Sequence, residues 1–301
     1  MRMVVTGGAG FIGSHVVEAL LERGDEVHVV DTLVSGKREN VPVEATLHEL
    51  DIRDEALVAL VAELGAEGIV HLAAQADVRV SVARPQLDAE VNVLGTLRVL
   101  EAAQGVGAKI VFASTGGAIY GECDAPATEE SPRRPLAPYG TSKLCGEEYL
   151  ATYNRLYGST HAALRFANVY GPRQNPHGEA GVVAIFFGLL AEGKQCKVFG
   201  TGGQQRDYVY VGDVARATLA AFGLDGGVLN IGTGRATSDL ELYRACCAAA
   251  GVEAEPLFAP ARLGDLQRSV LDITLAGELL GWAPERSLEQ GLADTWASFA
   301  P

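Results

Sequence analysis

The sequence predicts an α/β protein in which a doubly wound parallel sheet is followed by a smaller C-terminal α/β lobe. Apolar runs of strand length alternate with amphipathic segments of helix length through about residue 166, which is the βαβ rhythm of a parallel sheet. A glycine-rich turn joins the first run to the first helix. The expected strands of the sheet are Met3–Val5, Val27–Val30, Ala45–Leu50, Gly68–Leu72, Lys109–Phe112 and Thr160–Phe166.

The first strand runs into glycines three residues apart and then into an amphipathic helix over residues 11–23. Gly7 permits a tight turn, Gly10 lets the backbone approach a pyrophosphate, and Gly13 lets the helix pack close to the strand. The N-terminus of the helix offers unpaired N–H groups to the anion. This arrangement predicts the dinucleotide-binding turn of a Rossmann unit.

Asp31 ends the second strand, 18 residues after Gly13. This is close to the spacing of about 20 residues at which a carboxylate binds the adenosine ribose hydroxyls. Asp31 would repel a 2′-phosphate, so we expect the cofactor to be NAD. Lys37 and Arg38 lie further along and leave NADP open.

Composition excludes several classes of function. The 301-residue chain is 48% hydrophobic, which is enough for a large core, and its net charge of −14 argues against nucleic acid or an anionic membrane as partner. No basic and apolar leader precedes the first strand, and the longest apolar run, residues 182–191, is too short to cross a bilayer. The five cysteines show no metal spacing and no even-numbered disulfide framework. We expect a cytoplasmic protein without a metal.

Beyond the sixth strand the regular alternation weakens. We expect one domain over residues 1–168 and a second lobe over residues 169–301, with some strands of the second returning to the main sheet. A loop is expected over Pro172–Gly178, and the later elements are a helix ending near Gly193, strands at Lys197–Phe199, Tyr208–Val211 and Val228–Ile231, a helix from Asp213, and helices at Asp239–Ala250 and Thr274–Leu280.

Ligands of open α/β sheets bind at the carboxyl ends of the strands. The loops that follow the fourth, fifth and sixth strands are therefore expected to face one crevice. They contain Ala73, Ala74 and Gln75, then Ser114, Thr115, Gly116 and Gly117, and then Asn168.

Tyr139 and Lys143 are four residues apart at the start of a predicted helix over residues 138–157, so their side chains share one face. Free tyrosine has a pKa of about 10 and is a poor base. A nearby ammonium group and a positive nicotinamide ring both favour the phenolate. In a dinucleotide-binding fold, this pair predicts a base that can start hydride transfer.

These residues resemble those of the extended short-chain dehydrogenase/reductase family, and within it the nucleotide-sugar 4-epimerases typified by UDP-glucose 4-epimerase. The resemblance extends nearly from end to end. Its motifs are the segment 6–13, Asp31, Asp51-Ile52, the segment 71–75, Asn92 with 93–96, Ser114-Thr115, Tyr139 with Lys143, the segment 168–173, Arg206-Asp207-Tyr208 and the segment 262–265.

The resemblance implies NAD-dependent epimerisation at C4 of a UDP-hexose through a transient 4-keto sugar. Tyr139 would take the proton of the 4-hydroxyl, Lys143 would hold the nicotinamide ribose, and Thr115 would bind O4. The segment after Ser114 is one residue longer than usual, so Ser114 is the alternative to Thr115.

The resemblance also implies the binding residues. For NAD they are Gly7, Gly10, Phe11, Ile12, Gly13, Asp31, Asp51, Ile52, Leu72, Ala73, Ala74, Gln75, Asn92, Tyr139, Lys143 and Phe166. For the UDP-sugar they are Asn168, Val182, Val198, Phe199, Arg206, Arg262, Asp265 and Ser269, with both arginines on the diphosphate and Asp265 on a ribose hydroxyl.

Three other functions stay open. Related 4,6-dehydratases carry an acidic pair where this chain has Gly116-Gly117, and an elimination needs such a general acid. UDP-glucuronate 4-epimerases tend to have arginine in place of Asn175 and threonine in place of Asn168. A non-catalytic NAD-sensing regulator would usually lack the intact pair of Tyr139 and Lys143.

Two further expectations concern substrate breadth and assembly. In the resembling epimerases the position of Ser269 borders the C2 substituent, and a small residue there admits UDP-GlcNAc and UDP-GalNAc; otherwise Ser269 is an ordinary surface residue. Helices over residues 86–104 and 138–157 pair across a two-fold axis in the family, which implies a homodimer unless they only cover the sheet. His71 is expected to be a satisfied core residue, and His177 to be solvated.

Overall fold

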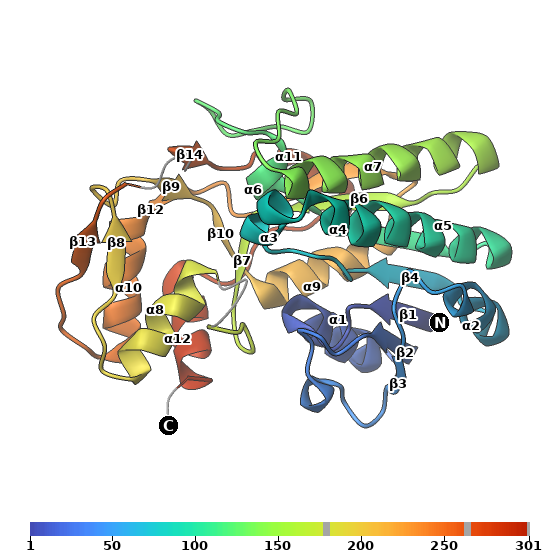
Figure 1. The fold of residues 1–301 in the computed structure, drawn as a ribbon, viewed down its shortest axis with the longest axis horizontal. Coiled ribbons are helices and arrows are strands. Elements are labelled where there is room, and N and C mark those ends of the chain that lie inside the picture. The colour runs from blue at the N-terminus through green and yellow to red at the C-terminus, as the bar shows by residue number, and fades with distance from the viewer. Residues whose placement is uncertain (177–180, 262–265, 300–301) are drawn as a thin grey trace.

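The computed structural model describes residues 1–176, 181–261 and 266–299. Among these residues, seven strands form one sheet in which all neighbours are parallel (Figure 1). In spatial order the strands are β11 (Gly227–Ile231), β6 (Ala162–Phe166), β5 (Lys109–Thr115), β4 (Gly68–His71), β1 (Arg2–Thr6), β2 (Glu26–Asp31) and β3 (Thr46–Glu49). The predicted doubly wound sheet is confirmed, and the strand order reverses between β1 and β4. The seventh strand comes from the C-terminal part of the chain.

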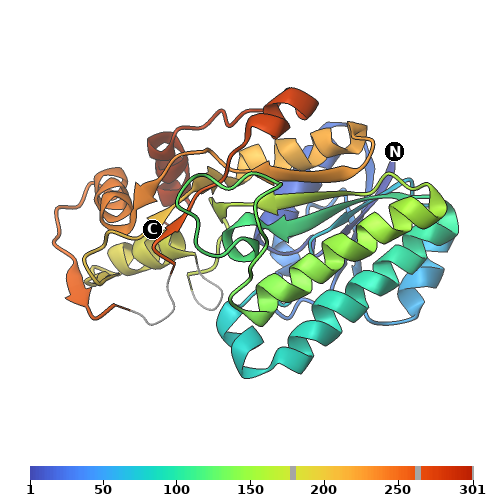
Figure 2. The same ribbon diagram turned by 90° about the horizontal axis from the view of Figure 1, so that it is seen from above.

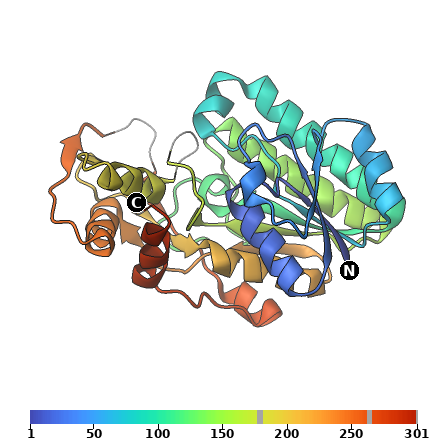
Figure 3. The same ribbon diagram turned by 90° about the horizontal axis from the view of Figure 1, so that it is seen from below.

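Helices cover both faces of this sheet because successive side chains of a buried strand point to opposite sides. In β1, Val4 belongs to one apolar cluster, whereas Met3 and Val5 belong to another. The first cluster is covered by α2 (Ala56–Leu64), α5 (Gly95–Val106) and α7 (Pro138–Tyr157). The second is covered by α1 (Phe11–Glu22) and α9 (Val211–Ala220). Figure 2 shows α5 and α7 side by side on their face, and Figure 3 shows α1 in front of the other face.

The second group of elements lies beside the carboxyl ends of the strands (Figure 1). Its apolar centre includes Tyr170, Phe186, Phe187 and Tyr243. Its helices are α8 (Val182–Ala191), α10 (Asp239–Ala250) and α12 (Leu288–Ala297), and its strand pairs are β7 (Asn168–Tyr170) with β10 (Tyr208–Tyr210), β8 (Lys197–Phe199) with β13 (Leu257–Ala259), and β9 (Gln205–Arg206) with both β12 (Thr237–Ser238) and β14 (Arg268–Ser269).

One predicted helix is interrupted. The helix expected over residues 86–104 consists of α4 (Pro85–Ala89), a π-helical turn at Glu90–Leu94, and α5. Such turns insert one extra residue and are frequent at functional sites, and here the turn carries Asn92. The remaining short helices are α3 (Val78–Ala83), α6 (Gly116–Ile119), α11 (Thr274–Leu280) and the 3-10 turns Arg38–Asn40 and Ala221–Gly223. None of the described helices is long and apolar enough to cross a membrane.

Helix α7 approaches β5 closely at a glycine. A Cβ atom on Gly146 would lie 2.7 Å from Cζ of Phe112, whose ring is fully buried below it. The helix starts with Pro138 in its first turn and is capped after Tyr157 by Gly158, which adopts the left-handed conformation with φ of 67°. Gly146 therefore sets how near α7 lies to the sheet.

Replacing Gly146 with alanine should destabilise the protein. Helix propensity favours alanine by about 1 kcal/mol, but overpacking against the fixed Phe112 ring should cost about 1–3 kcal/mol. Thermal unfolding measures the balance. Gly105→Ala is the matched control, because Gly105 lies in α5 with open space around its Cα and should become more stable. An increased melting temperature for Gly146→Ala would contradict the close contact.

A buried chain of hydrogen bonds crosses the sheet at His71. Nδ1 of His71 lies 2.7 Å from Oγ1 of Thr6, and Nε2 lies 3.0 Å from Oγ1 of Thr96. The Thr96 hydroxyl donates to the Asn92 carbonyl at 2.6 Å, so it accepts from Nε2–H, and Thr6 donates to Nδ1. Burial lowers the pKa of His71 to about 3. His71 is thus a neutral, satisfied core residue, as predicted.

This histidine should make stability fall in mild acid. Between pH 3 and 6.5 the unfolded chain binds a proton at His71 and the folded chain does not, so acid favours unfolding. At pH 5 the effect is about 2 kcal/mol relative to pH 7. Urea unfolding at both pH values should show that His71→Asn, although less stable at pH 7, loses about 2 kcal/mol less between them. Equal losses in both proteins would contradict a neutral His71.

Candidate functional site

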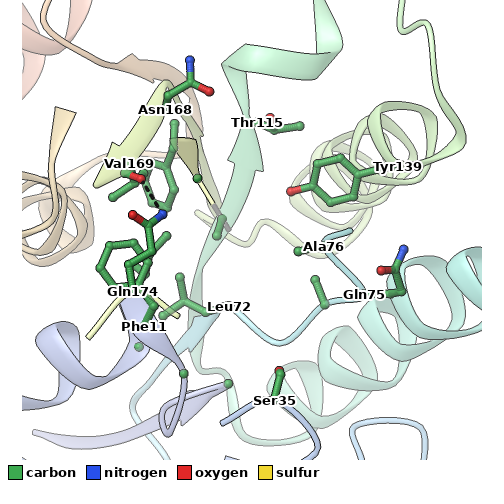
Figure 4. Close-up of a pocket in the computed structure, with 18 of the residues that line it drawn as sticks. Phe11, Ser35, Leu72, Gln75, Ala76, Thr115, Tyr139, Asn168, Val169 and Gln174 are labelled. Carbon is green, nitrogen blue, oxygen red and sulfur yellow. Dashed lines mark hydrogen bonds between the residues drawn. The ribbon is translucent and has the colours of Figure 1, made fainter. Parts of the chain in front are cut away.

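A cavity of about 1170 Å³ lies at the carboxyl ends of the central strands and extends to helix α8 and strand β8 (Figure 4). It includes the point between β1 and β4 where the strand order reverses, which is where open α/β sheets bind ligands. Most of the predicted site residues line it: Gly7, Gly10, Phe11, Ile12, Gly13, Asp31, Asp51, Ile52, Leu72, Ala73, Ala74, Gln75, Ser114, Thr115, Tyr139, Lys143, Phe166, Asn168, Val182, Val198, Phe199 and Arg206.

The glycine turn forms one end of this cavity. Gly7 has φ of 73°, and a Cβ atom there would lie 2.7 Å from the backbone nitrogen of Ala73. A Cβ atom on Gly13 would lie 2.1 Å from the Gly7 carbonyl oxygen. Gly10 is the N-cap of α1 and has no side chain to satisfy the first N–H groups of the helix. Glycine is required at positions 7 and 13 of this turn, and the first N–H groups of α1 have no side-chain cap.

Asp31 lies at the end of β2 and is held by the backbone. Its carboxylate accepts from the backbone nitrogens of Ala9 at 3.0 Å and Leu33 at 2.8 Å. Gly36 passes so close that a Cβ atom there would lie 2.9 Å from both carboxylate oxygens. The two cations that left NADP open are paired elsewhere, since Lys37 lies 3.4 Å from Glu39 and Arg38 lies 2.8 Å from Glu49.

The loops after β3 and β4 complete this side of the cavity. Asp51 binds Arg53 through two nitrogens, at 3.0 and 2.6 Å, and the guanidinium group lowers the pKa of the carboxyl. Asn92 does not line the cavity. Its amide instead exchanges two hydrogen bonds with the backbone of Gln75, at 2.8 and 2.9 Å. Asn92 therefore fixes the backbone of the loop at Gln75 from the side that faces away from the cavity.

Tyr139, Lys143 and Thr115 line the cavity together. Figure 4 shows the Tyr139 hydroxyl and the Thr115 side chain directed toward the same space. Lys143 lies one turn further along α7, and its ammonium group donates to the Ala113 carbonyl at 2.9 Å and lies 4.8 Å from the centre of the Phe112 ring. The side chains come from the end of β5 and the start of α7, as the sequence predicts.

Ser114 has a different environment from Thr115. Although Ser114 lines the cavity, it is 4% exposed and its hydroxyl donates to the Glu147 carboxylate in the protein interior. Of the two hydroxyl groups that the sequence left as alternatives, the Thr115 group is therefore the one available to a ligand in the cavity.

The other end of the cavity is formed by the second group of elements. Asn168 begins β7, Val182 begins α8, and Val198 and Phe199 belong to β8. Arg206 of β9 donates to the Gln205 carbonyl at 2.9 Å and borders the cavity. The structure thus brings these residues together from four separate segments.

One described substrate residue that the sequence predicts does not line the cavity, and two others cannot be placed. Ser269 is 8% exposed and pairs with Arg206 across strands β14 and β9, but it does not line the cavity. The small serine is therefore buried, which is not the environment of a surface residue. Arg262 and Asp265 lie outside the described residues, as does His177.

Sequence patterns missed Gln174, which lies in the loop after β7. Its amide nitrogen donates to the Val169 carbonyl at 3.1 Å (Figure 4), and its buried Oε1 atom has no partner among the described residues. A Cβ atom on Gly181 would lie 2.6 Å from Nε2 of Gln174, so this side chain also spaces the start of α8. No spacing rule identifies such a residue, because Gln174 lies in a loop, where side chains follow no regular period.

The cavity fits a dinucleotide followed by a second ligand. The glycine turn supplies donors for a pyrophosphate, and Asp31 supplies acceptors for ribose hydroxyls. Lys143 and Arg206 line the same cavity. Carboxylates among the described lining residues are Asp31, Asp51 and Asp239, and none of these adjoins Thr115 in sequence.

Comparisons with known proteins agree with this geometry. Residues 3–232 match the model of the NAD dependent epimerase/dehydratase family. The UDP-glucose 4-epimerase of Mycolicibacterium smegmatis is 48% identical over 98% of this chain and 97% of its own length. The crystal structure of Thermotoga maritima UDP-glucose 4-epimerase with UDP-glucose has a TM-score of 0.97 and 48% identity, covering 99% of this chain and 98% of that one.

A second solved structure, the Thermus thermophilus UDP-glucose 4-epimerase in complex with NAD, has a TM-score of 0.93 and 48% identity over 99% of both chains. The family match covers more than half of the chain, and the relatives cover nearly all of it. This protein belongs to the NAD dependent epimerase/dehydratase family.

Proposed function

We propose that this protein is a UDP-glucose 4-epimerase that interconverts UDP-glucose and UDP-galactose with tightly bound NAD. The observation that carries the proposal is that Tyr139, Lys143 and Thr115 line the same cavity as the glycine turn and Arg206. The relatives at 48% identity, which bear the name UDP-glucose 4-epimerase, support it.

Residues 1–168 would hold NAD and residues 169–301 most of the nucleotide sugar. The turn at Gly7, Gly10 and Gly13 would bind the pyrophosphate, and Asp31 the adenosine ribose. The chemistry that NAD supplies when bound is reversible hydride transfer at C4 of the sugar, through a transient 4-keto sugar. Asp31, with both basic neighbours paired elsewhere, favours NAD over a cofactor with a 2′-phosphate.

Tyr139 would accept the proton of the sugar 4-hydroxyl. It would return this proton to O4 after the keto sugar has rotated in the site to present the opposite face of C4. The ammonium group of Lys143, on the same face of α7, would favour the phenolate form that this step needs. Thr115 would hold O4 by a hydrogen bond while its charge develops. These residues come from the rigid ends of a strand and a helix, so their geometry is fixed before the substrate binds.

Arg206 would pair with the diphosphate of the UDP-sugar, because a guanidinium group suits two phosphate oxygens. Asn168 would add a neutral donor, and Val198 and Phe199 would line the base. We propose the same role at the diphosphate for Arg262, a ribose contact for Asp265, and a small-residue boundary near C2 for Ser269.

The other functions have less support. A 4,6-dehydratase needs a carboxylic acid beside the catalytic threonine, and here α6 begins with Gly116 and Gly117. A UDP-glucuronate 4-epimerase would need a cation near Asn168 or Asn175 to bind the sugar carboxylate. Burying this carboxylate without a cation would cost free energy. A regulator without activity would not need the arrangement of Tyr139, Lys143 and Thr115.

Turnover of UDP-galactose, UDP-N-acetylgalactosamine and UDP-galacturonate, measured side by side, tests the proposal. Tyr139→Phe should lower epimerisation by about 100-fold or more, because proton removal is lost, and should leave NAD bound. Tyr157→Phe is the control, since this exposed tyrosine at the end of α7 should have no effect. Near-normal turnover by Tyr139→Phe would refute its role as the base.

We also propose a two-fold dimer formed by α5 and α7. The supporting observation is the exposure of apolar side chains near this pair: Leu94 is 59% exposed, Tyr149 39% and Leu156 67%. Tyr149 and Leu156 are seven residues apart and share one face of α7.

We also propose that the protein is cytoplasmic. All five cysteines are free thiols, which agrees with this location.

A charge on this face of α7 should disrupt the dimer. Light scattering at micromolar concentration should show a dimer for the unmodified protein and a monomer for Leu156→Arg, because a charge buried in an apolar contact is costly. Leu279→Arg is the matched control: Leu279 is 58% exposed on α11, and the dimer should persist. A monomeric unmodified protein would refute the assembly.

A further inference from the structure

A row of buried polar side chains crosses three neighbouring strands directly beneath the ends that carry the candidate site. Ser114 of β5 is the register partner of Arg165 in β6, and Arg165 is the register partner of Asn230 in β11. Their exposed fractions are 4%, 2% and 0%. Facing them across the sheet surface is Glu147 of α7, whose side chain is 2% exposed.

These groups satisfy one another. Arg165 binds the Glu147 carboxylate through two nitrogens, at 2.9 and 2.6 Å, and the Ser114 hydroxyl donates to the same carboxylate. Arg165 also donates to the Tyr120 hydroxyl at 2.7 Å, which in turn donates to Oδ1 of Asn230 at 2.7 Å. The charges of Glu147 and Arg165 are thus paired in a part of the protein that excludes water.

Stability alone does not explain this buried ion pair. Removing two charges from water is costly, and apolar residues of the same volume often serve as well or better. Hydrogen bonds differ from apolar contacts in being directional, so they fix one relative position of the elements that they join. Here they join α7 to β5 and β6.

The position that they fix is the one the candidate site needs. Glu147 lies four residues after Lys143 and eight after Tyr139, so all three share the face of α7 that lies on the sheet. Lys143 bonds the Ala113 carbonyl and Glu147 accepts from Ser114, so the helix is bound to two successive residues of β5. The next residue of that strand is Thr115.

We propose that Ser114 and Glu147 are positioning residues that fix α7 relative to β5. In this position the side chains of Tyr139 and Thr115 can both contact the same atom of the substrate. The proposal rests on the proposed function for its catalytic consequence. It gives Ser114 a role that involves no contact with the substrate, and it gives the ion pair of Glu147 and Arg165 the role of holding the carboxylate in place.

Ser114→Ala tests this in the NAD-loaded protein. Loss of one hydroxyl should lower kcat by about tenfold to 100-fold, because small displacements of catalytic groups are costly, and should leave the KM for UDP-galactose and the bound NAD unchanged. Hydrogen exchange over residues 138–146 should become faster. Ser81→Ala is the matched control, because Ser81 is also buried and its hydroxyl donates only to the Val78 carbonyl. This substitution should change neither kcat nor the rate of hydrogen exchange over residues 138–146.

A double-mutant cycle with Glu147→Gln tests whether the two residues act through each other. The double variant should lose no more kcat than the worse single variant, whereas independent effects would multiply. Glu147→Gln removes the carboxylate that neutralises Arg165, and this variant can fail to fold. In that case kcat and hydrogen exchange of Ser114→Ala still test the positioning role of Ser114.

Two results would overturn the proposal: kcat of Ser114→Ala within about twofold of the unmodified protein, or an increased KM at unchanged kcat, which would make Ser114 a substrate contact. Failure of the proposed function is distinguishable, because the unmodified protein would then show no turnover in the same assay. The exchange measurement would in that case still report whether Ser114 holds α7.

Discussion

The packing of helix α7 on strand β5 is the constraint on which the candidate site depends. Gly146 lets the helix come close enough to contact the Phe112 ring, and the Lys143 ammonium lies above the same ring. Because α7 is continuous over twenty residues, its approach at Gly146 also sets the depth at which Tyr139 enters the cavity. The residues proposed to be catalytic are therefore positioned by the core and not by loops.

A second constraint joins the two groups of elements. Arg173, in the loop after β7, binds Glu18 of α1 through both of its terminal nitrogens and also contacts His15. Its φ of 69° is unusual for a residue with a side chain. This contact ties the segment that leads to Gln174 and α8 to the helix whose N-terminus forms the glycine turn. Both ends of the cavity are thus held against one helix.

The charge distribution explains how an acidic protein can offer a site for anionic ligands. The described cations that line the cavity are Arg53, Lys143, Lys197 and Arg206, and the first is already bound by Asp51. Lys143 is turned toward the Ala113 carbonyl. At the position proposed for the pyrophosphate, the glycine turn offers backbone N–H groups in place of cations. Neutral donors at a helix N-terminus bind anions without requiring a basic surface.

The sequence alone determined the sheet, its glycine turn, Asp31 and the pair of Tyr139 and Lys143, because strand alternation, tight turns and helical spacing are local properties that period and residue type reveal. It also placed His71 in the core. Only the tertiary structure decided that Ser114 faces Glu147 and leaves Thr115 to the cavity, that Asn92 supports Gln75 from a π-helical turn, that Ser269 is buried beside Arg206, and that β11 is the strand that returns to the main sheet. These outcomes depend on strand register and on contacts between residues far apart in the chain, and local sequence patterns do not report which distant residue a side chain will contact.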